Sequence, residues 1–559
     1  MRPMAQRRRA ITVLAVLALA GLAITAAGCG SKSAGNSGQS TGTPKKGGTI
    51  TLSYYSEPSS LDPAIAWNVI DWSVEHCIFQ SFLQYDPKPG MEGTKLIPCL
   101  ATEVPSTQNG GISADGKTYT FHLKHGIKFQ PPISREVTAQ DFKYTIERVL
   151  DPKTTPVPPG QSFYLNITGA KAFNSGKAKD VTGITTPDDY TVQIHLDSPD
   201  LSFLNAVTME FCDVIPKEWV DQWGKNIGHH PLGTGPYMFV SWKPGQEIAL
   251  KRNPDYWDPS HVWADEIDYM MSFNPSTALL KLQRGEVDAL GDNVPPSDIV
   301  RIKHDPTWSK YLVSQPLIAI SYLYMDVLSK PFDNVKVRQA VSWAIDRDKL
   351  VKLQAGQAVP LYQVYPPGMP GYQEGVKYYG YDPAKAKALL AEAGFANGFK
   401  TQLYTDNVDP DPKLMQSVQN DLAAVGIQAD LRTMSNNAYY TFQGQPGKST
   451  MGSFGWWMDY PDPSDWIGPL FSKASAVAGG MNSSFWWSPQ LEQMFTEAQA
   501  MTDPQTRLAK YDDMQKYILD QAPYATLYAP IETTMCSKTL GGFYLHPVYE
   551  LDPAHYWQQ

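Results

Sequence analysis

Alternation of apolar and polar residues predicts β-strands in the N-terminal half of the chain. In "KTYTFHLKHGIKF", Tyr119, Phe121 and Leu123 fall on one face of an extended backbone. The segment "YTVQIHL" at 190–196 alternates in the same way. We therefore expect two strands here, each with one buried face.

Apolar residues at helical spacing, with start and stop signals, predict helices elsewhere. "TAQDFKYTIERVL" begins with Thr138 as a cap and has Asp141 three residues later. "DPAKAKALLAEAGF" has Asp382 as a cap, Pro383 at the first helical position and Gly394 as the stop. Because strands and helices interleave along the chain, the expected class is α/β or α+β, not a helical bundle or a β-sandwich.

The N-terminal segment has the pattern of an export signal. Four arginines lie within the first nine residues, and the apolar run at 11–25 is short for a membrane span. Small residues then precede Cys29, which resembles the end of a bacterial lipoprotein signal over 1–28. We expect Cys29 to carry a lipid and to tether the protein to the extracytoplasmic face of the bacterial cell membrane. A plain signal peptide cleaved nearby is the alternative.

The Gly/Ser-rich stretch at 29–48 is expected to be a flexible tether, because it cannot bury a core. A flexible chain of this length spans on the order of 25 Å. The folded body is therefore expected to start near Thr49. About 510 residues remain, too many for one hydrophobic core, so two large lobes or three domains are expected.

Charge and composition restrict the class of ligand only in part. The formal net charge is −9, and loss of the four signal arginines leaves −13. This balance argues against binding to nucleic acid or to acidic lipid surfaces, and it fits cationic or neutral solutes. The 30 tyrosines and 15 tryptophans fit a protein that binds a solute between rigid surfaces, and they fit equally the packing of large cores.

Four cysteines remain after Cys29. An even number in an exported chain predicts two disulfides, with three possible pairings. We favour Cys77–Cys99 and Cys212–Cys536. No Cys-x-x-Cys or histidine-rich spacing predicts a metal site, and neither a metal nor another cofactor is expected.

Sequence motifs for catalysis are missing. The stretch "GTGP" at 233–236 lacks the Gly-Lys-Ser/Thr ending of a P-loop, so we interpret it as a tight turn before a strand that starts at Tyr237. Outside the Gly/Ser-rich tether, the chain has neither a Gly-x-Ser-x-Gly elbow nor a His-Glu-x-x-His helix. It is therefore not expected to be an enzyme. A secreted hydrolase that uses two carboxylates is the weakest alternative.

A series of sequence blocks follows a characteristic order from about residue 48 to the C-terminus. The blocks include "GGTITLSYYSEPSSLDPA", "ADGKTYTFHLKHGIKF", "PLGTGPYMFVSWKPGQEIALKRNPDYW", "KPFDNVKVRQAVSWAIDRDKL", "GWWMDYPDP" and "GMNSSFWWSPQLEQM". Together they resemble the extracytoplasmic solute-binding proteins of the peptide/nickel ABC-importer family. Two details differ from the family pattern. The loop after Phe129 lacks the usual Asp-Gly turn, and Glu492 stands where aspartate is usual.

The resemblance implies a two-lobed periplasmic-binding-protein fold, type II-like and of the large peptide-binding class. Lobe I is expected over 49–83, 206–318 and 531–559, with an inserted domain at 84–205, and lobe II over 319–530. The hinge passages between the lobes are expected near 316–322 and 525–531. Solute binding in the cleft would then stabilise a closed form.

The function implied by the resemblance is a lipid-anchored receptor of an ABC importer. It captures a peptide-like solute in the cleft and delivers it to the membrane permease and the ATPase subunits, and a monomer is expected. The same scaffold with an oligosaccharide or a metal chelate as its ligand is the alternative.

One stretch, "GWWMDYPDPSDW" at 455–466, carries the main candidate for ligand binding. Asp462 and Asp465 are explained as an N-cap and a first-turn acid of a helix that starts at Pro463. Asp459 has no such explanation, and its carboxylate costs several kcal/mol to desolvate unless a cation meets it. In peptide-binding members, the acid at the matching position pairs with the α-ammonium of the ligand. Bonding to amides of the turn before Pro461 is the alternative.

The other candidates for ligand binding surround this acid. Trp456 and Trp457, which follow Gly455, alternate along an extended stretch, so one is expected to face the cleft and the other the lobe. Trp67 follows the "LDP" turn and is expected either to stack on the solute or to belong to the core of lobe I. Asn482 is expected to touch the ligand or to brace the Asp459 loop. The weaker candidates Tyr54 and Asn437 are expected to be structural more often than functional.

Overall fold

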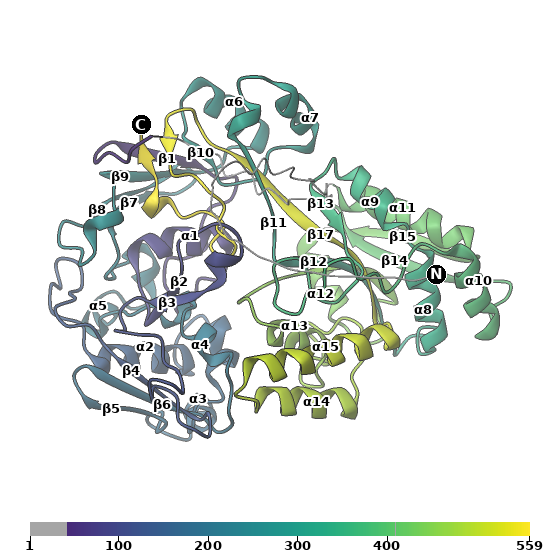
Figure 1. The fold of residues 1–559 in the computed structure, drawn as a ribbon, viewed down its shortest axis with the longest axis horizontal. Helices are drawn as coiled ribbons and strands as arrows, with labels where there is room; N and C mark the ends of the chain where they lie inside the picture. Colours follow the sequence, from purple (N-terminus) through teal and green to yellow (C-terminus); the bar gives the residue numbers. More distant parts are fainter. Residues whose placement is uncertain (1–41, 409) are drawn as a thin grey trace, which may run out of the picture. The chain divides into compact units, whose positions relative to one another are not determined.

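The computed structural model describes residues 42–408 and 410–559 (Figure 1). The predicted signal peptide and the lipidation residue Cys29 lie outside the described residues. Within the described ranges, no helix is both long and apolar enough to cross a membrane.

The first sheet has the strand order β10-β1-β9-β8-β7. Its strands are β1 (Thr49–Ser53), β7 (Tyr237–Lys243), β8 (Glu247–Arg252), β9 (Glu266–Met270) and β10 (Ala289–Leu290). β1 runs parallel to β9 and β10, and Ile50 and Leu52 on β1 are fully buried. Helix α1 (Val69–Ile78) packs on this sheet, where the Tyr269 hydroxyl donates a 2.8 Å hydrogen bond to the carbonyl of Ser73.

The segment between these strands forms a separate three-stranded sheet, β4-β6-β5, with helix α2 (Ala139–Leu150) packed on it. β4 (Thr118–His122) and β6 (Thr191–His195) confirm the two predicted strands, and β5 (Ile184–Asp188) is a third strand that was not predicted. Tyr119 on β4 pairs with Ile194 on β6, and both are buried. α2 begins with the predicted capping box of Thr138 and Asp141.

The second large sheet has the order β11-β17-β12-β16-β14-β15, with β13 paired to β17. Its strands are β11 (Leu312–Pro316), β12 (Ala319–Met325), β13 (Ala358–Pro360), β14 (Phe399–Asp406), β15 (Ile427–Met434), β16 (Met451–Trp457) and β17 (Tyr524–Met535). β12 separates two hydrophobic cores. Leu323 and Met325 belong to one core, and Ile320, Tyr322 and Tyr324 belong to the other.

Helices cover both cores of this sheet. Helices α8 (Val335–Ala344), α9 (Arg347–Leu353), α10 (Pro383–Glu392) and α11 (Asp411–Ala424) contribute to the first core, and α13 (Ser464–Phe471), α14 (Pro489–Gln499) and α15 (Pro504–Gln521) to the second. α10 has the predicted cap, because the Asp382 carboxylate accepts from the amide of Lys385. The remaining elements are α3 (Ala170–Asn174), α4 (Phe203–Ala206), α5 (Lys217–Trp223), α6 (Pro275–Arg284), α7 (Pro296–His304), α12 (Asn436–Gln443), β2 (Leu83–Tyr85), β3 (Leu96–Pro98), β18 (Leu540–Gly541), β19 (Trp557–Gln558) and short 3-10 turns.

β17 is a long strand that pairs with β12 and β11 in succession, and its middle part also pairs with β13. Its first part, from Tyr524 to Tyr528, pairs with β12, and its second part, from Ile531 to Met535, pairs with β11 (Figure 1, yellow). The two predicted hinge passages fall on this strand and on the β11–β12 connection. The lobe boundaries and the hinge motion remain predictions.

The "GTGP" stretch is a tight turn before β7, and Tyr237 begins that strand as predicted. The amide of Gly235 donates a 2.8 Å hydrogen bond to the carbonyl of Ile78. A Cβ atom at Gly233 or Gly235 would lie 2.5–2.7 Å from backbone atoms of residues 77 and 78. Glycine is required here because two backbone segments approach each other closely.

The prediction of two disulfides is wrong for the structure, in which all four cysteines are buried free thiols. Cys99 and Cys212 belong to one hydrophobic core, and Cys77 and Cys536 belong to another. Both favoured pairs therefore join residues of different cores. Burial raises the pKa of the Cys77 and Cys99 thiols to about 12. They behave as apolar packing groups.

Candidate functional site

The loop that follows β16 holds the three aspartates of "GWWMDYPDPSDW". The amide of Asp459 donates a 2.9 Å hydrogen bond to Oδ2 of Asp465, and the Trp456 indole donates to the same oxygen at 3.3 Å. The carboxylate of Asp465, not that of Asp459, therefore accepts the backbone amide hydrogen bond in this turn. Asp465 is buried at 1% exposure, and its pKa lies well above its usual range because of burial and of the charge of Asp459.

The structural role of Asp462 differs from that of the predicted N-cap. α13 begins at Ser464, one residue later than predicted, and Asp462 accepts from the Ser464 amide at 2.9 Å. Both of its carboxylate oxygens also accept hydrogen bonds from Arg507 on α15, at 2.6 and 2.8 Å. This bidentate ion pair fixes the loop to α15.

Asp459 has the environment of a carboxylate that lacks a cation. Its Oδ1 atom accepts a 3.2 Å hydrogen bond from Nε1 of Trp67, and no ion pair involves it within the described residues. Burial raises the pKa of Asp459 to about 7, against the lowering effect of the Trp67 bond. A cation placed at this carboxylate would favour its ionised form.

Trp67 reaches Asp459 from the loop after the "LDP" turn. This turn is fixed by a bidentate ion pair between Asp62 and Arg148, with both N–O distances at 2.6 Å. The Trp67 ring packs edge-on against Phe211 at 6.1 Å between centroids and remains 40% exposed. Trp67 is therefore not a buried core residue. It borders the main cavity, and stacking on the solute stays a prediction.

Trp456 and Trp457 differ in exposure, although both border the main cavity. Trp456 packs against the core between the second sheet and α13–α15, whereas Trp457 is 54% exposed. A Cβ atom on Gly455 would lie 2.5 Å from the Trp457 ring and 3.2 Å from the carbonyl of Ile320. Glycine at this position lets the Trp457 ring fold back over the strand.

Three cavities meet around Trp457. The main cavity has a volume of about 530 Å³ and is bordered by Trp67, Tyr439, Tyr440, Gly455, Trp456 and Asp459, among others. A second, smaller cavity of about 90 Å³ is bordered by Glu210, Asp459 and Glu550, and a third of about 570 Å³ by Asp292, Glu532 and Glu550. Trp457 borders all three, so the three cavities lie next to one another around this residue.

Asn482 and Tyr54 are structural. Asn482 is fully buried, and its amide donates to the carbonyls of Ser472 and Trp486, so it braces its own loop and neither the Asp459 loop nor a ligand. Tyr54 is 4% exposed, stacks on Tyr269 and shares a 3.1 Å hydrogen bond with Ser73, although it also borders the third cavity. The side chain of Asn437 lies outside the described part of the chain.

Several residues around the cavities carry no signal in the sequence. Tyr439 and Tyr440 lie on α12, Glu210 lies in a short turn, and Glu532 lies on β17. Apart from the adjacent tyrosines, they are 92 to 322 residues apart along the chain and meet only in the fold. The tyrosine pair next to the predicted Asn437 is the only local hint.

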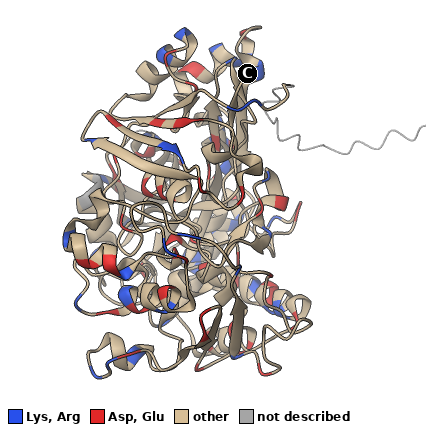
Figure 2. Cartoon of the chain, turned by 90° about the vertical axis from the view of Figure 1, so that its left-hand side faces the viewer, with Lys and Arg blue, Asp and Glu red and all other residues tan. Residues whose placement is uncertain are grey.

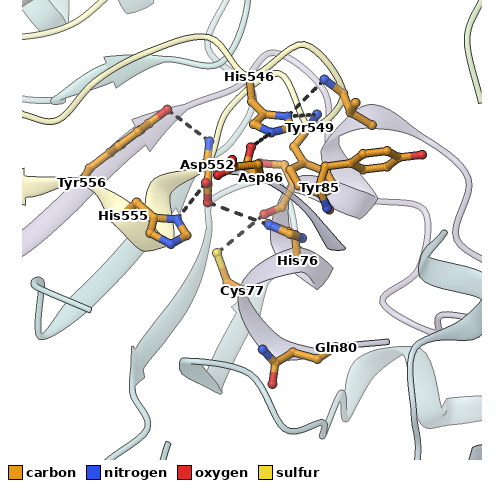
Figure 3. Close-up of polar contacts among 12 residues, drawn as sticks. His76, Cys77, Gln80, Tyr85, Asp86, His546, Tyr549, Asp552, His555 and Tyr556 are labelled. Carbon is orange, nitrogen blue, oxygen red and sulfur yellow. Dashed lines mark hydrogen bonds and ion pairs between the residues drawn. The ribbon is translucent and has the colours of Figure 1, made fainter. Parts of the chain in front are cut away.

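A second polar cluster joins the C-terminal segment to α1 (Figure 3). Nδ1 of His555 lies 2.7 Å from Oδ2 of Asp552, and His76 approaches the other oxygen at 3.9 Å. Nε2 of His546 bonds the carbonyl of Asp86, and its Nδ1 accepts from the amides of Val548 and Tyr549. No group of His, Cys, Asp or Glu side chains in the described ranges is arranged to hold a metal ion. The cluster links the C-terminal segment to His76 on α1 and to the carbonyl of Asp86.

Comparisons with known proteins agree with this arrangement. A family model described as bacterial extracellular solute-binding proteins, family 5 Middle, matches residues 95–477. The di/tripeptide-binding protein 1 of Pseudomonas aeruginosa (strain UCBPP-PA14) is 30% identical over 518 residues, covering 88% of this chain and 92% of that protein. The dipeptide-binding protein of Escherichia coli (strain K12) is 31% identical over 480 residues, covering 81% of this chain and 85% of that protein.

Solved structures have the same fold. The periplasmic binding protein DppA from Helicobacter pylori, in complex with the peptide STSA, matches with a TM-score of 0.74 at 27% identity, over 92% of this chain and 98% of that one. The clavulanic acid biosynthesis oligopeptide binding protein 2 matches with a TM-score of 0.85 at 22% identity, over 92% and 96% of the two chains. The predicted mixed α/β binding-protein fold is confirmed, and so is the prediction of a binding protein instead of an enzyme. The chain belongs to the family 5 bacterial extracellular solute-binding proteins.

Proposed function

We propose that this protein is the receptor of an ABC importer for peptides and that Asp459 binds the α-ammonium group of the solute. The carboxylate of Asp459 carries the proposal. It borders two cavities, its side-chain partners are the Trp67 indole and the Asp465 carboxyl, and no cation of the described chain meets it. An ammonium group supplies both the charge and the hydrogen bonds that this site lacks, worth about 1.5–3 kcal/mol for a charge-assisted bond.

The relatives support a peptide as the ligand. Two are named for the binding of dipeptides or of di- and tripeptides, and one structure holds the peptide STSA. The main cavity has room for several residues, and the exposed Trp457 ring offers a flat surface beside the carboxylate. An extended peptide can bond to backbone groups along such a cleft in the manner of an added strand.

The proposal includes the anchor and the transporter. Lipidation at Cys29 would hold the receptor on the extracytoplasmic face of the membrane, with the Gly/Ser-rich tether giving it reach. Bending at the β11–β12 connection and at β17 would close the lobes around the solute, and the closed form would pass it to the permease and its ATPase subunits. Only contacts made in the closed form can drive this closure.

Mass spectrometry of small molecules released on denaturation of the protein purified from its host tests the ligand class. Short peptides with free amino ends are expected. Titration calorimetry with peptides, oligosaccharides and metal chelates then gives the affinities. Release of a sugar or a chelate, together with no binding of any peptide, would overturn the proposal.

A further inference from the structure

The three cavities around Trp457 are lined by acids of one sign. Eight carboxylate residues border them, namely Glu57, Glu210, Asp292, Asp406, Asp411, Asp459, Glu532 and Glu550. No Lys, Arg or His among the described residues borders any of the three. Elsewhere along the chain basic and acidic residues are interspersed (Figure 2). The cleft therefore differs from the rest of the protein in its charge.

Two of these acids are buried without a cationic partner. Glu210 and Glu532 are each 4% exposed, and neither forms an ion pair within the described part of the chain. The Glu210 carboxyl is bonded by its own backbone amide, whereas burial and neighbouring acids act on the Glu532 carboxyl. Burial raises the pKa of Glu210 to about 8. Such a group is costly to keep ionised unless a cation arrives, because water is largely excluded from it.

Glu532 belongs to a triad of neighbouring acids in the third cavity. Burial, together with the charges of Glu550 and Asp292, holds the pKa of Glu532 well above its usual range. Burial and the charge of Asp292 raise the pKa of Glu550 to about 7. Three carboxyl groups that repel one another around one cavity form a site where positive charge is stabilised.

Several buried aspartates away from these cavities have basic partners. Asp62 pairs with Arg148, Asp462 with Arg507 and Asp552 with His555. Other buried acids, among them Asp71, Asp326 and Glu75, have no ion pair within the described residues. The acids at the three cavities differ from both groups because they border space that a ligand can enter.

We propose that the solute is a basic peptide, whose lysine or arginine side chains lie beside Glu210 and beside the Asp292–Glu532–Glu550 triad while its amino end lies at Asp459. This rests on the proposed function and names its substrate class. Trp457 borders all three cavities, so side chains extending from a peptide in the main cavity would reach the second and the third. A neutral peptide leaves these carboxyls unpaired, and an acidic peptide is repelled.

The charge of this lining also predicts how the carboxyl end of the ligand affects its affinity. No described side chain at these cavities offers a cation to a ligand carboxylate. A peptide with an amidated C-terminus is therefore expected to bind at least as tightly as the free acid. A receptor with a dedicated carboxylate site would lose affinity on amidation.

Titration calorimetry with the protein and three tripeptides at pH 8 tests the proposal. Tri-lysine is expected to bind at least tenfold more tightly than tri-alanine, and tri-glutamate at least 100-fold more weakly than tri-lysine. Equal affinities for tri-lysine and tri-alanine would overturn the basic-peptide proposal and leave the peptide receptor intact. If spermidine binds and no peptide does, the preference for positive charge stands but the proposed function fails. If neither binds, both fail.

Two variants locate the effect. Glu532→Gln and Glu210→Gln remove a charge and keep the shape, and each is expected to lower the ratio of tri-lysine to tri-alanine affinity at least fivefold. Exposed Glu374, which borders none of the cavities, gives the matched control Glu374→Gln, whose ratio is expected to stay at the wild-type value. Thermal unfolding of each variant checks that it is folded. An unchanged ratio in both folded cleft variants would contradict the proposal.

Discussion

Nε1 of Trp67 donates a 3.2 Å hydrogen bond to Oδ1 of Asp459, across 392 residues of sequence. This contact joins the loop after the first "LDP" turn to the loop after β16. The indole is a neutral donor, so it stabilises the carboxylate only in part, and the pKa of Asp459 stays at about 7. A ligand ammonium would be the stronger partner.

Peptide affinity is expected to depend on pH through Asp459. The carboxyl must be ionised to bind an ammonium, so affinity is full above about pH 7 and falls by up to tenfold per pH unit below it. Titrations of tri-alanine between pH 5.5 and 7.5 check this. The indole bond lowers the pKa of Asp459, so Trp67→Phe is expected to move the midpoint to higher pH. Trp487→Phe, at an exposed tryptophan away from the cavities, is the control. A flat profile in the wild type would contradict the account.

Gly455→Ala is expected to weaken peptide binding. The new methyl group would lie 2.5 Å from the Trp457 ring and would push the ring toward the cavities. The loss is expected to be about tenfold, as for an overpacking effect of about 1–3 kcal/mol. Gly380→Ala is the matched control, because its methyl group would meet its nearest neighbour, the Trp343 ring, at 3.8 Å. Calorimetry with one peptide compares the two variants. Equal affinities of the two variants would show that displacement of the Trp457 ring does not affect peptide binding.

Arg507→Met is expected to destabilise the protein and to weaken binding. It leaves Asp462 buried without its cation, at a cost of about 3–5 kcal/mol. The loop that carries Asp459 would shift as well. Arg301→Met breaks an exposed pair with Asp298 and is expected to cost about 0–1 kcal/mol. Denaturant unfolding measures both. A loss of stability in Arg507→Met no greater than in Arg301→Met would contradict the anchoring role of this pair.

His546 is expected to make the protein less stable in acid. Its pKa is lowered to about 4, first by burial, and its Nδ1 accepts two amide hydrogen bonds that protonation would break. The unfolded chain binds a proton near pH 6.5 and the folded chain does not until about pH 4. The free energy of unfolding therefore falls by about 3 kcal/mol on this account between pH 6.5 and 4.

Two variants isolate this histidine from its neighbours. Asp552, His76 and His555 also titrate in the cluster, with the pKa of His555 raised and that of His76 lowered. His546→Gln is expected to be less stable at pH 7 and to lose most of the decline between pH 6.5 and 4. Exposed His304→Gln should keep the wild-type decline. If His546→Gln declined as steeply as the wild type, the assignment would be wrong.

Local signals predicted some parts of this structure well. The caps at Thr138 and Asp382 and the turn before Tyr237 depend on contacts within a few residues or on the needs of glycine, and they lie where the pattern places them. The family resemblance supplied the fold and drew attention to Asp459. Neither the local signals nor the family resemblance requires knowledge of which distant residues are in contact.

Contacts between distant segments could not be predicted from the sequence. The disulfide prediction failed because two cysteines lie in each of two cores, which spacing does not show. Asn482 lies in a block that resembles the family but bonds only within its own loop. The sequence does not predict Glu210 or Glu532 as site residues, because no residue near either of them indicates that it borders a cavity. Their charges gain meaning only from the absence of nearby cations.

The most direct test of the central claim is a pair of titrations on Asp459→Asn. The variant keeps the shape and removes the charge, so the wild type is expected to bind tri-lysine at least 100-fold more tightly than the variant does. N-acetylated tri-lysine, which lacks the α-ammonium, is expected to bind both proteins weakly and within a few-fold of each other. Asp189→Asn, at an exposed aspartate away from the cavities, is the control. Equal affinity of the wild type and Asp459→Asn for tri-lysine would contradict the claim that Asp459 binds the amino end of a peptide.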